Sequence, residues 1–248
     1  RTPGTIVSSN TSGIPLQAMS QELSLEFKQH FMGTHFFNPV RYMKLLEIIP
    51  GEDTLPEILE FMADFGERFL GKGIVWAKDT PNFVANRIGV YGVLHAIEVM
   101  RDLGLSVEAV DQLTGPVIGH PKSASFRTAD LVGLDTLLFV AHTVRDHAPD
   151  DESRDTFRAP GFFLKMVEAG RLGRKVGAGF YKKVKKDIVA LDLETMEYRE
   201  QIRPDFAETK ALKKIDDPGE RVRAFVGGEG RACGLAWDFL APTLSYAA

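Results

Sequence analysis

Hydrophobic positions in the range 1–78 alternate between short runs typical of β-strands and longer stretches with helical spacing. The β-like runs cover residues 5–9, 32–36, 44–49 and 73–77. Between them, residues 17–31 and 55–70 repeat apolar side chains at the spacing of an amphipathic helix. Alternating strands and helices favour an α/β layer built on a mixed or parallel sheet.

The pattern changes at Asp79-Thr80-Pro81, where a capping residue type followed by Pro predicts the start of a helix. A long helical pattern over residues 82–103 ends at Gly104. Further helices are predicted over residues 106–113, over 126–147 with an interruption near Gly133, and over 160–169. This part of the chain is predicted to be a separate helical domain.

The remainder of the chain is more varied. A lysine cluster at residues 182–186 predicts a solvated linker. A strand is predicted over residues 187–194, and two or three short helices over 204–248. The predicted domains are therefore residues 1–78, 79–183 and 184–248.

The composition, with 44% hydrophobic and 26% charged residues in a chain of 248, is that of a globular domain. One cysteine excludes an intramolecular disulfide and argues against a Cys-based zinc site. A net charge of -4 argues against a nucleic-acid surface. No apolar run approaches the ~18–20 residues of a membrane span, and no signal peptide is present, so we expect a cytoplasmic protein.

Glycine-rich nucleotide loops are not found in the sequence. Gly228-Glu229-Gly230 follows a predicted helix and has Cys233 where a third Gly is required. Gly71-Lys72 is followed by Gly73 instead of the Ser or Thr of a phosphate loop. His142 and His147 are five residues apart, which is not a ligand spacing on one helix face, and we predict no metal site.

His35 and Glu47 are the strongest candidates for chemistry. His35 ends a predicted strand within an aromatic run, shortly before the turn at Pro39. Glu47 lies in a strand that is apolar on both faces, where a carboxylate is costly unless it is paired. We predict that Glu47 pairs with His35, either to orient a general base or as a structural hydrogen bond without chemistry.

Two further polar segments could converge on this pair. Residues 9–12 follow the first strand and are rich in hydroxyl and amide groups, or form an ordinary turn. Asn86 is predicted in the second turn of the long helix, although Asn is a poor residue for a helix interior. It is either a donor aimed at an oxyanion or a helix-to-loop hydrogen bond.

Together these segments resemble the L-3-hydroxyacyl-CoA dehydrogenase family of fatty-acid β-oxidation. The matching segments occur in the family's order within residues 5–183: residues 9–12, 35–39, 43–47, 79–87, 132–135 and 173–181. Each segment alone is weak, but six in order are specific.

The resemblance implies that His35 is the catalytic base and that Glu47 orients it. It places Ser12 and Asn86 at the substrate's 3-oxygen or the nicotinamide. The implied reaction is oxidation of (S)-3-hydroxyacyl-CoA to 3-oxoacyl-CoA with NAD. The implied fold is a partial Rossmann-like sheet followed by an all-α domain of the 6-phosphogluconate-dehydrogenase C-terminal type.

The resemblance also places Asn38, Lys175 and Ser12 at the cofactor. In the family a helical domain forms a homodimer and closes over the acyl-CoA. The family's Gly-rich fingerprint and the acidic ribose contact after it are not found here. Because the chain also starts at Arg1 and not Met, we expect a fragment with the NAD-binding half largely missing and little activity by itself.

The chain continues for 67 residues after Tyr181, and in this stretch residues 239–248 resemble the opening helix of a second helical domain in long multifunctional members. We therefore expect a fused parent, for which an enoyl-CoA hydratase part is an analogy only.

Two other functions are weighed against the dehydrogenase. A non-catalytic dimerisation or acyl-CoA-binding module could keep the same scaffold, but it would be expected to lose His35 or Glu47, and both are present. A hydrolase using Ser12 and His35 lacks a nucleophile elbow.

Overall fold

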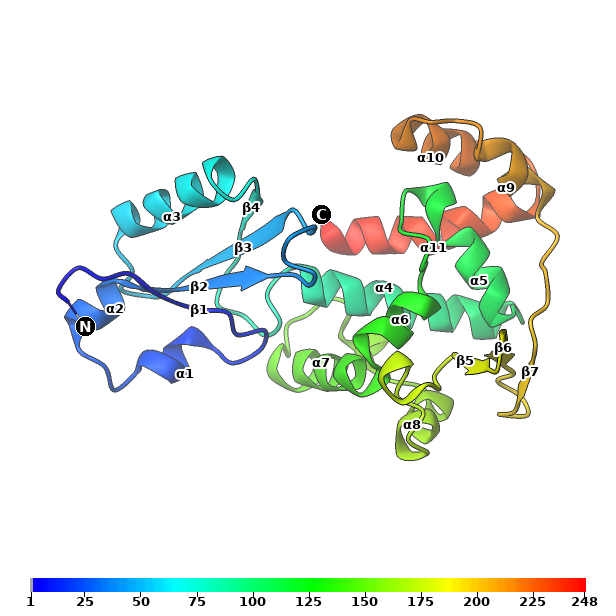
Figure 1. Cartoon of the computed structure of the whole chain (residues 1–248), viewed down its shortest axis with the longest axis horizontal. Coiled ribbons are helices and arrows are strands. Elements are labelled where there is room, and N and C mark those ends of the chain that lie inside the picture. Colours follow the sequence, from blue (N-terminus) through cyan, green and yellow to red (C-terminus); the bar gives the residue numbers. More distant parts are fainter. Residues whose placement is uncertain (1) are drawn as a thin grey trace. The chain divides into compact units, whose positions relative to one another are not determined.

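The computed structural model describes residues 2–248, which form two compact units (Figure 1). The first contains the residues up to Arg87 together with Asp146–Asp150, and the second contains Ile88–Arg145 and Asp151–Ala248.

The first unit is built on a four-stranded sheet in the order β1-β2-β3-β4. Its strands are β1 (Val7–Ser9), β2 (Phe31–Phe36), β3 (Leu45–Pro50) and β4 (Gly73–Trp76). The central pair β2 and β3 is antiparallel, and the two outer pairs are parallel. This mixed sheet confirms the predicted α/β class.

Three helices accompany the sheet: α1 (Leu16–Ser20), α2 (Leu25–Gln29) and α3 (Pro56–Arg68). The prediction of one helix over residues 17–31 is wrong, because the chain forms two short helices and then enters β2 at Phe31. Ser24 ends the first segment and starts the second, since its side chain accepts a hydrogen bond from the Phe27 N–H.

Each face of the sheet has its own core. On one face, a cluster of Met32, Leu46 and Ile48 packs against apolar side chains of α3. On the other face, Phe31 and Ile49 belong to a cluster that also includes residues of α1 and of the segment after β4. Side chains alternate along a strand, so His35 and Glu47 lie on this second face.

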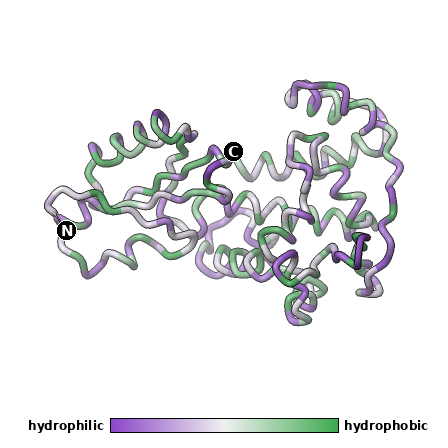
Figure 2. The backbone as a smooth tube through the Cα atoms, viewed as in Figure 1, coloured by the Kyte–Doolittle hydropathy of each residue, from purple (hydrophilic) through white to green (hydrophobic). Residues whose placement is uncertain are grey.

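The second unit is mostly helical, with hydrophobic positions that recur along its helices (Figure 2). Its helices are α4 (Ala85–Asp102, of which the first three residues belong to the first unit), α5 (Val107–Leu113), α6 (Phe126–Val132), α7 (Leu134–His147), α8 (Gly161–Glu168), α9 (Ala207–Leu212), α10 (Pro218–Val226) and α11 (Arg231–Ala247). The predicted interruption at Gly133 is present between α6 and α7.

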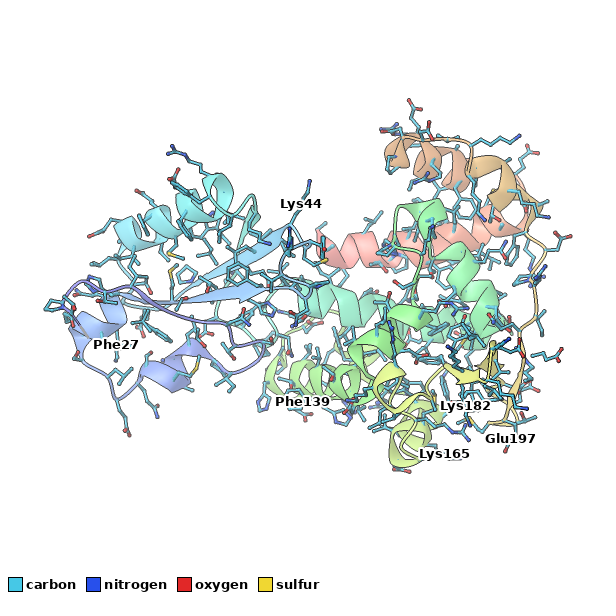
Figure 3. The ribbon with its side chains drawn as sticks, viewed as in Figure 1. Phe27, Lys44, Phe139, Lys165, Lys182 and Glu197 are labelled. Atoms are coloured by element: carbon cyan, nitrogen blue, oxygen red, sulfur yellow. The ribbon has the colours of Figure 1, made fainter. Side chains whose placement is uncertain are left out.

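A small antiparallel sheet follows α8, and its second strand confirms the strand predicted over residues 187–194. It contains β5 (Tyr181–Val184), β6 (Asp187–Leu191) and β7 (Tyr198–Glu200). The lysine cluster predicted as a linker forms β5 and the turn to β6, where Lys185 has a φ of 56°. The lysines are exposed as expected, but the ladder is stabilised by backbone pairing; Lys182 (Figure 3) lies 5.3 Å from the ring of Tyr198 on β7.

Asp130 explains two of the glycines in the 173–181 segment. Its carboxylate is buried and accepts hydrogen bonds from the Phe180 N–H at 2.8 Å and the Tyr181 N–H at 2.9 Å. A Cβ at Gly173 or Gly179 would collide with Asp130, so only glycine lets the chain come this close. Burial raises the pKa of Asp130 to about 6, despite the two N–H donors.

Helix α11 continues through a proline. Pro242 has no N–H for the Asp238 carbonyl four residues earlier. The ring of His95 on α4 replaces that donor, because its Nε2 lies 2.8 Å from the Asp238 oxygen, which can only accept. Helices α9 to α11 lie in the same compact unit as α4 to α8, and their assignment to a further domain stays a prediction.

Candidate active site

His35 and Glu47 face each other across the central strand pair. The antiparallel register of β2 and β3 makes them direct partners. The predicted hydrogen bond is present, with His35 Nδ1 2.6 Å from Glu47 Oε2, and the Glu47 side chain is fully buried. A carboxylate accepts, so Nδ1 carries the proton and the lone pair of the neutral ring is on Nε2.

The loop after β1 brings Ser12 to that nitrogen. Ser12 Oγ lies 3.0 Å from His35 Nε2, and Ser12 is exposed whereas His35 is buried. Asn10 holds this loop against β2, since its side-chain oxygen accepts from the Phe36 N–H at 2.9 Å. The structure thus orders an imidazole and a hydroxyl at the carboxyl end of β1 and β2, where open α/β sheets bind their ligands.

The second oxygen of Glu47 has partners that were not anticipated from the sequence. Oε1 accepts from the Val84 N–H at 3.0 Å and from the Ala85 N–H at 2.7 Å. These are amides at the N-terminus of α4, the positive end of the helix dipole. Both oxygens of this fully buried carboxylate are therefore hydrogen-bonded, with three N–H groups as donors.

Two phenylalanines pack against the imidazole. The ring of Phe37 lies edge-on with its centroid 4.5 Å from that of His35, and the ring of Phe83 lies at 5.6 Å. Phe37 belongs to the aromatic run that follows His35 in the sequence. Phe83 comes much later in the chain, beyond β4, and no local pattern linked it to His35.

Asp79 and α4 correct two predictions about the start of the long helix. Asp79 does not cap that helix: its carboxylate accepts from the Leu16 N–H at 2.9 Å and the Gln17 N–H at 3.1 Å, so it caps α1. Helix α4 begins at Ala85, not at residue 82, which places Asn86 in its first turn and not its second. Within residues 2–248, the half-buried Asn86 side chain makes no hydrogen bond, so its role stays a prediction.

The residues predicted for the cofactor lie in different units. Asn38 is exposed in the loop between β2 and β3, ahead of Lys44 (Figure 3), and its peptide bond to Pro39 is cis. Lys175 belongs to the second unit, where its Nζ lies 2.6 Å from both carboxylate oxygens of Asp135. Contacts of either residue with a cofactor stay predictions.

NAD fits part of the first unit. The exposed Ser12 hydroxyl and His35 Nε2 lie together at the carboxyl end of the strands, the edge at which open α/β sheets bind nucleotides. In the described part of the chain, by contrast, no glycine-rich turn leads from a strand into a helix to receive a pyrophosphate. No cluster of metal-ligating side chains is found among residues 2–248 either.

Comparison with known families decides the membership. The model of the 3-hydroxyacyl-CoA dehydrogenase NAD binding domain matches residues 1–80, and the model of the C-terminal domain matches residues 83–183. The chain belongs to the 3-hydroxyacyl-CoA dehydrogenase family. The sequence-based expectation of this family is confirmed, and the fold of partial Rossmann-like sheet followed by a largely helical part agrees with it.

Curated relatives within the family are longer than this chain. A probable 3-hydroxyacyl-CoA dehydrogenase of Bacillus subtilis is 51% identical over all 248 residues, which span 31% of that protein. A Deinococcus radiodurans protein with the same description is 50% identical over 182 residues, or 73% of this chain and 52% of that one. The Ralstonia eutropha (S)-3-hydroxybutyryl-CoA dehydrogenase structure is 33% identical, with a TM-score of 0.64 over 73% of this chain and 61% of that one.

The expectation of a largely missing cofactor half is not supported, because the model of the family's NAD-binding domain matches residues 1–80. None of the helices in the described residues is long and apolar enough to cross a membrane.

Proposed function

We propose that these residues provide the base of an NAD-dependent dehydrogenase that oxidises (S)-3-hydroxyacyl-CoA to 3-oxoacyl-CoA in fatty-acid β-oxidation. The observation that carries the proposal is the His35–Glu47 pair. Its 2.6 Å hydrogen bond places the proton on Nδ1 and leaves Nε2 as an acceptor beside an exposed hydroxyl. A secondary alcohol that loses hydride must also lose its proton, and Nε2 is placed to accept it.

The residues then divide the work as follows. His35 Nε2 takes the proton of the 3-hydroxyl, and Glu47 stabilises the imidazolium that forms. Ser12 Oγ donates a hydrogen bond to the 3-oxygen, and Asn86 is a second donor to it. Bound NAD⁺ supplies the hydride acceptor. In the reverse direction the imidazolium returns its proton to the ketone oxygen.

Aromatic packing shields the imidazole of His35. Phe37 and Phe83 pack on the imidazole, and His35 is only 3% exposed. Water therefore has little access to the Nδ1–Glu47 hydrogen bond, which strengthens it. Whenever the ring is neutral, it is therefore held in the tautomer with the proton on Nδ1.

Cofactor binding by the 248 residues alone is proposed to be weak. The chain lacks a glycine-rich pyrophosphate loop, and it spans only 31% of a relative that is 51% identical to it. We therefore assign the activity to a longer dehydrogenase that includes these residues, with Asn38 and Lys175 as cofactor contacts. A cytoplasmic location and a fused hydratase stay predictions.

A homodimer through the helical domain, with a surface from residues 82–147, is part of the same proposal. Sedimentation of the chain is expected to give a dimer. A monomer at high protein concentration would contradict this assignment.

The test of the catalytic proposal is His35→Ala in the full-length enzyme that contains these residues. We expect turnover of acetoacetyl-CoA and NADH to fall at least tenfold, since a general base contributes about 10²–10⁴-fold. His142→Ala is the matched control, because His142 is an exposed histidine on α7. An unchanged rate in His35→Ala would instead favour the non-catalytic acyl-CoA-binding module.

A further inference from the structure

The segment that leads into α4 has an unfavourable backbone. Two consecutive residues without glycine's freedom, Asn82 and Phe83, have φ values of 60° and 50°. Asn tolerates this left-handed region, but a bulky residue such as Phe rarely adopts it. Such a conformation is unfavourable and persists only where the surroundings impose it.

The conformation has a clear structural consequence. Directly after the two left-handed residues, the N–H groups of Val84 and Ala85 converge on one atom, Glu47 Oε1, at 3.0 and 2.7 Å. Val84 has no polar side chain with which to cap the helix. The cap of α4 is instead a carboxylate from β3, 37 residues earlier in the chain than Val84.

Glu47 is consequently shared between two tasks. Oε1 caps α4, and Oε2 receives the Nδ1–H of His35. Because one carboxylate group is planar and rigid, anchoring Oε1 also sets the direction of Oε2. Phe83 contributes a second constraint, since its side chain is buried and its ring lies against the imidazole.

We propose that Asn82 and Phe83 are positioning residues for the His35 base, acting through the Val84 and Ala85 amides and Glu47. The inference rests on the proposed function for its catalytic meaning. The left-handed turn aims two amides at Glu47, and this keeps its second oxygen aligned with Nδ1. The strained backbone is thereby the source of the order in the catalytic pair.

The decisive variant is Ala85→Pro, which removes one of the two N–H donors. Proline is favoured at the first position of a helix, which Ala85 occupies, so the helix itself is preserved. Gly161→Pro is the matched control: Gly161 is the first residue of α8, follows an extended residue, and a Cβ there meets nothing within 4 Å.

The first readout is proton NMR of the 248-residue chain. The low-field resonance of the His35 Nδ1–H is identified by its loss in His35→Gln. In Ala85→Pro we expect this resonance to move upfield and its proton to exchange faster with water, while Gly161→Pro leaves it in place. An unchanged resonance in a folded Ala85→Pro chain would overturn the proposal.

The second readout is the pH dependence of kcat/KM in the full-length enzyme. A weakened Glu47 anchor displaces the profile along the pH axis, whereas general loosening lowers the rate equally at every pH. A uniform fall without displacement would also overturn the proposal. If the unsubstituted enzyme has no dehydrogenase activity but the NMR change occurs, the proposed function fails and the positioning of His35 by α4 stands.

A pair of variants at Phe83 covers the case in which Ala85→Pro does not fold. Phe83→Ala and Phe83→Gly both lose the ring, but only glycine adopts a φ of 50° without penalty. We expect the glycine variant to keep the low-field resonance better than the alanine variant. Equal resonances, or a better one in Phe83→Ala, would refute a role for the left-handed backbone.

Discussion

Replacing Glu47 by Gln tests the catalytic pair most directly, because it keeps the shape of the side chain and removes one acceptor. The carboxylate accepts from three N–H groups: two backbone amides on Oε1 and His35 Nδ1 on Oε2. Gln has one acceptor oxygen and one NH₂ donor in the same place. It can satisfy the backbone or the imidazole proton, but not both.

The contacts decide which arrangement is preferred. If the amide oxygen faces His35, the NH₂ group opposes two buried backbone N–H groups, at a cost of about 1–3 kcal/mol for each donor left unpaired. The oxygen is therefore expected to stay with Val84 and Ala85. The NH₂ group then faces Nδ1, which must accept, so the proton moves to Nε2 and the base is lost.

With two donors at stake, the preference for the inactive tautomer is at least about 2 kcal/mol, which corresponds to a roughly thirtyfold lower rate. A wrong tautomer in a serine protease triad costs about 10⁴-fold. We therefore expect turnover in Glu47→Gln to fall by a factor between these values. Imidazole ¹⁵N shifts of the 248-residue chain are expected to show His35 protonated at Nε2.

The assay is loss of NADH absorbance with acetoacetyl-CoA in the full-length enzyme. Glu57→Gln, an exposed glutamate on α3, is the control for the same chemical change. A rate within about threefold of the unsubstituted enzyme, a difference of less than about 1 kcal/mol, would refute the tautomer argument. So would a His35 ring that remains protonated at Nδ1 in the variant.

Three more outcomes follow from the structure. Calorimetry is expected to show that the 248-residue chain binds NADH more weakly than micromolar, because it lacks a pyrophosphate loop; micromolar affinity would contradict this. His95→Ala should lower the free energy of unfolding by about 1 kcal/mol. The loss should be clearly smaller in a Pro242→Ala background, because the N–H introduced at position 242 can then bond the Asp238 carbonyl. Equal losses in both backgrounds would exclude the proposed compensation. Burial raises the pKa of Asp130 from 3.8 to about 6, so the folded chain binds this proton more tightly than the unfolded chain. Its contribution to stability therefore increases as the pH falls through 6, by about 1 kcal/mol between pH 7 and 5, and Asp130→Asn should remove this increase in denaturant titrations; an unchanged pH dependence would count against it.

Periodicity located the elements well where burial is local. The alternation in β3 indicated a strand buried on both faces, and the structure has four consecutive buried residues there. Because Glu47 lies in that buried strand, its carboxylate was expected to need a hydrogen-bonding partner. His35 was the nearest candidate, and the register confirms the pairing.

The residues that cap α1 and α4 could not be predicted from the neighbouring sequence. Asp79 stands just before the long helix and has the chemistry of its cap, yet it binds the amides of α1, 62 and 63 residues earlier. The helix is capped by Glu47, which no local pattern associates with it. A cap needs only an oxygen within hydrogen-bond distance of free amides, and folding can supply that oxygen from any strand.

The need for glycine at a given position also depends on contacts that are distant in the sequence. The sequence marked residues 173–181 as a family-like segment, but two of its glycines, Gly173 and Gly179, are required by Asp130 on the much earlier helix α6. The lysines that follow are hydrophilic and resemble a linker. They form a hairpin because the backbone of β5 pairs with that of β6.

The sequence by itself determined the family, the two kinds of structure along the chain and the His35–Glu47 pair, because these depend on residue order and on the cost of burying a charge. Tertiary structure decided how that pair is held. It brought the α4 amides to the second oxygen of Glu47, the Ser12 hydroxyl to Nε2 and Phe83 to the imidazole. Each of these contacts joins segments at least 23 residues apart, where geometry and not pattern sets the distance.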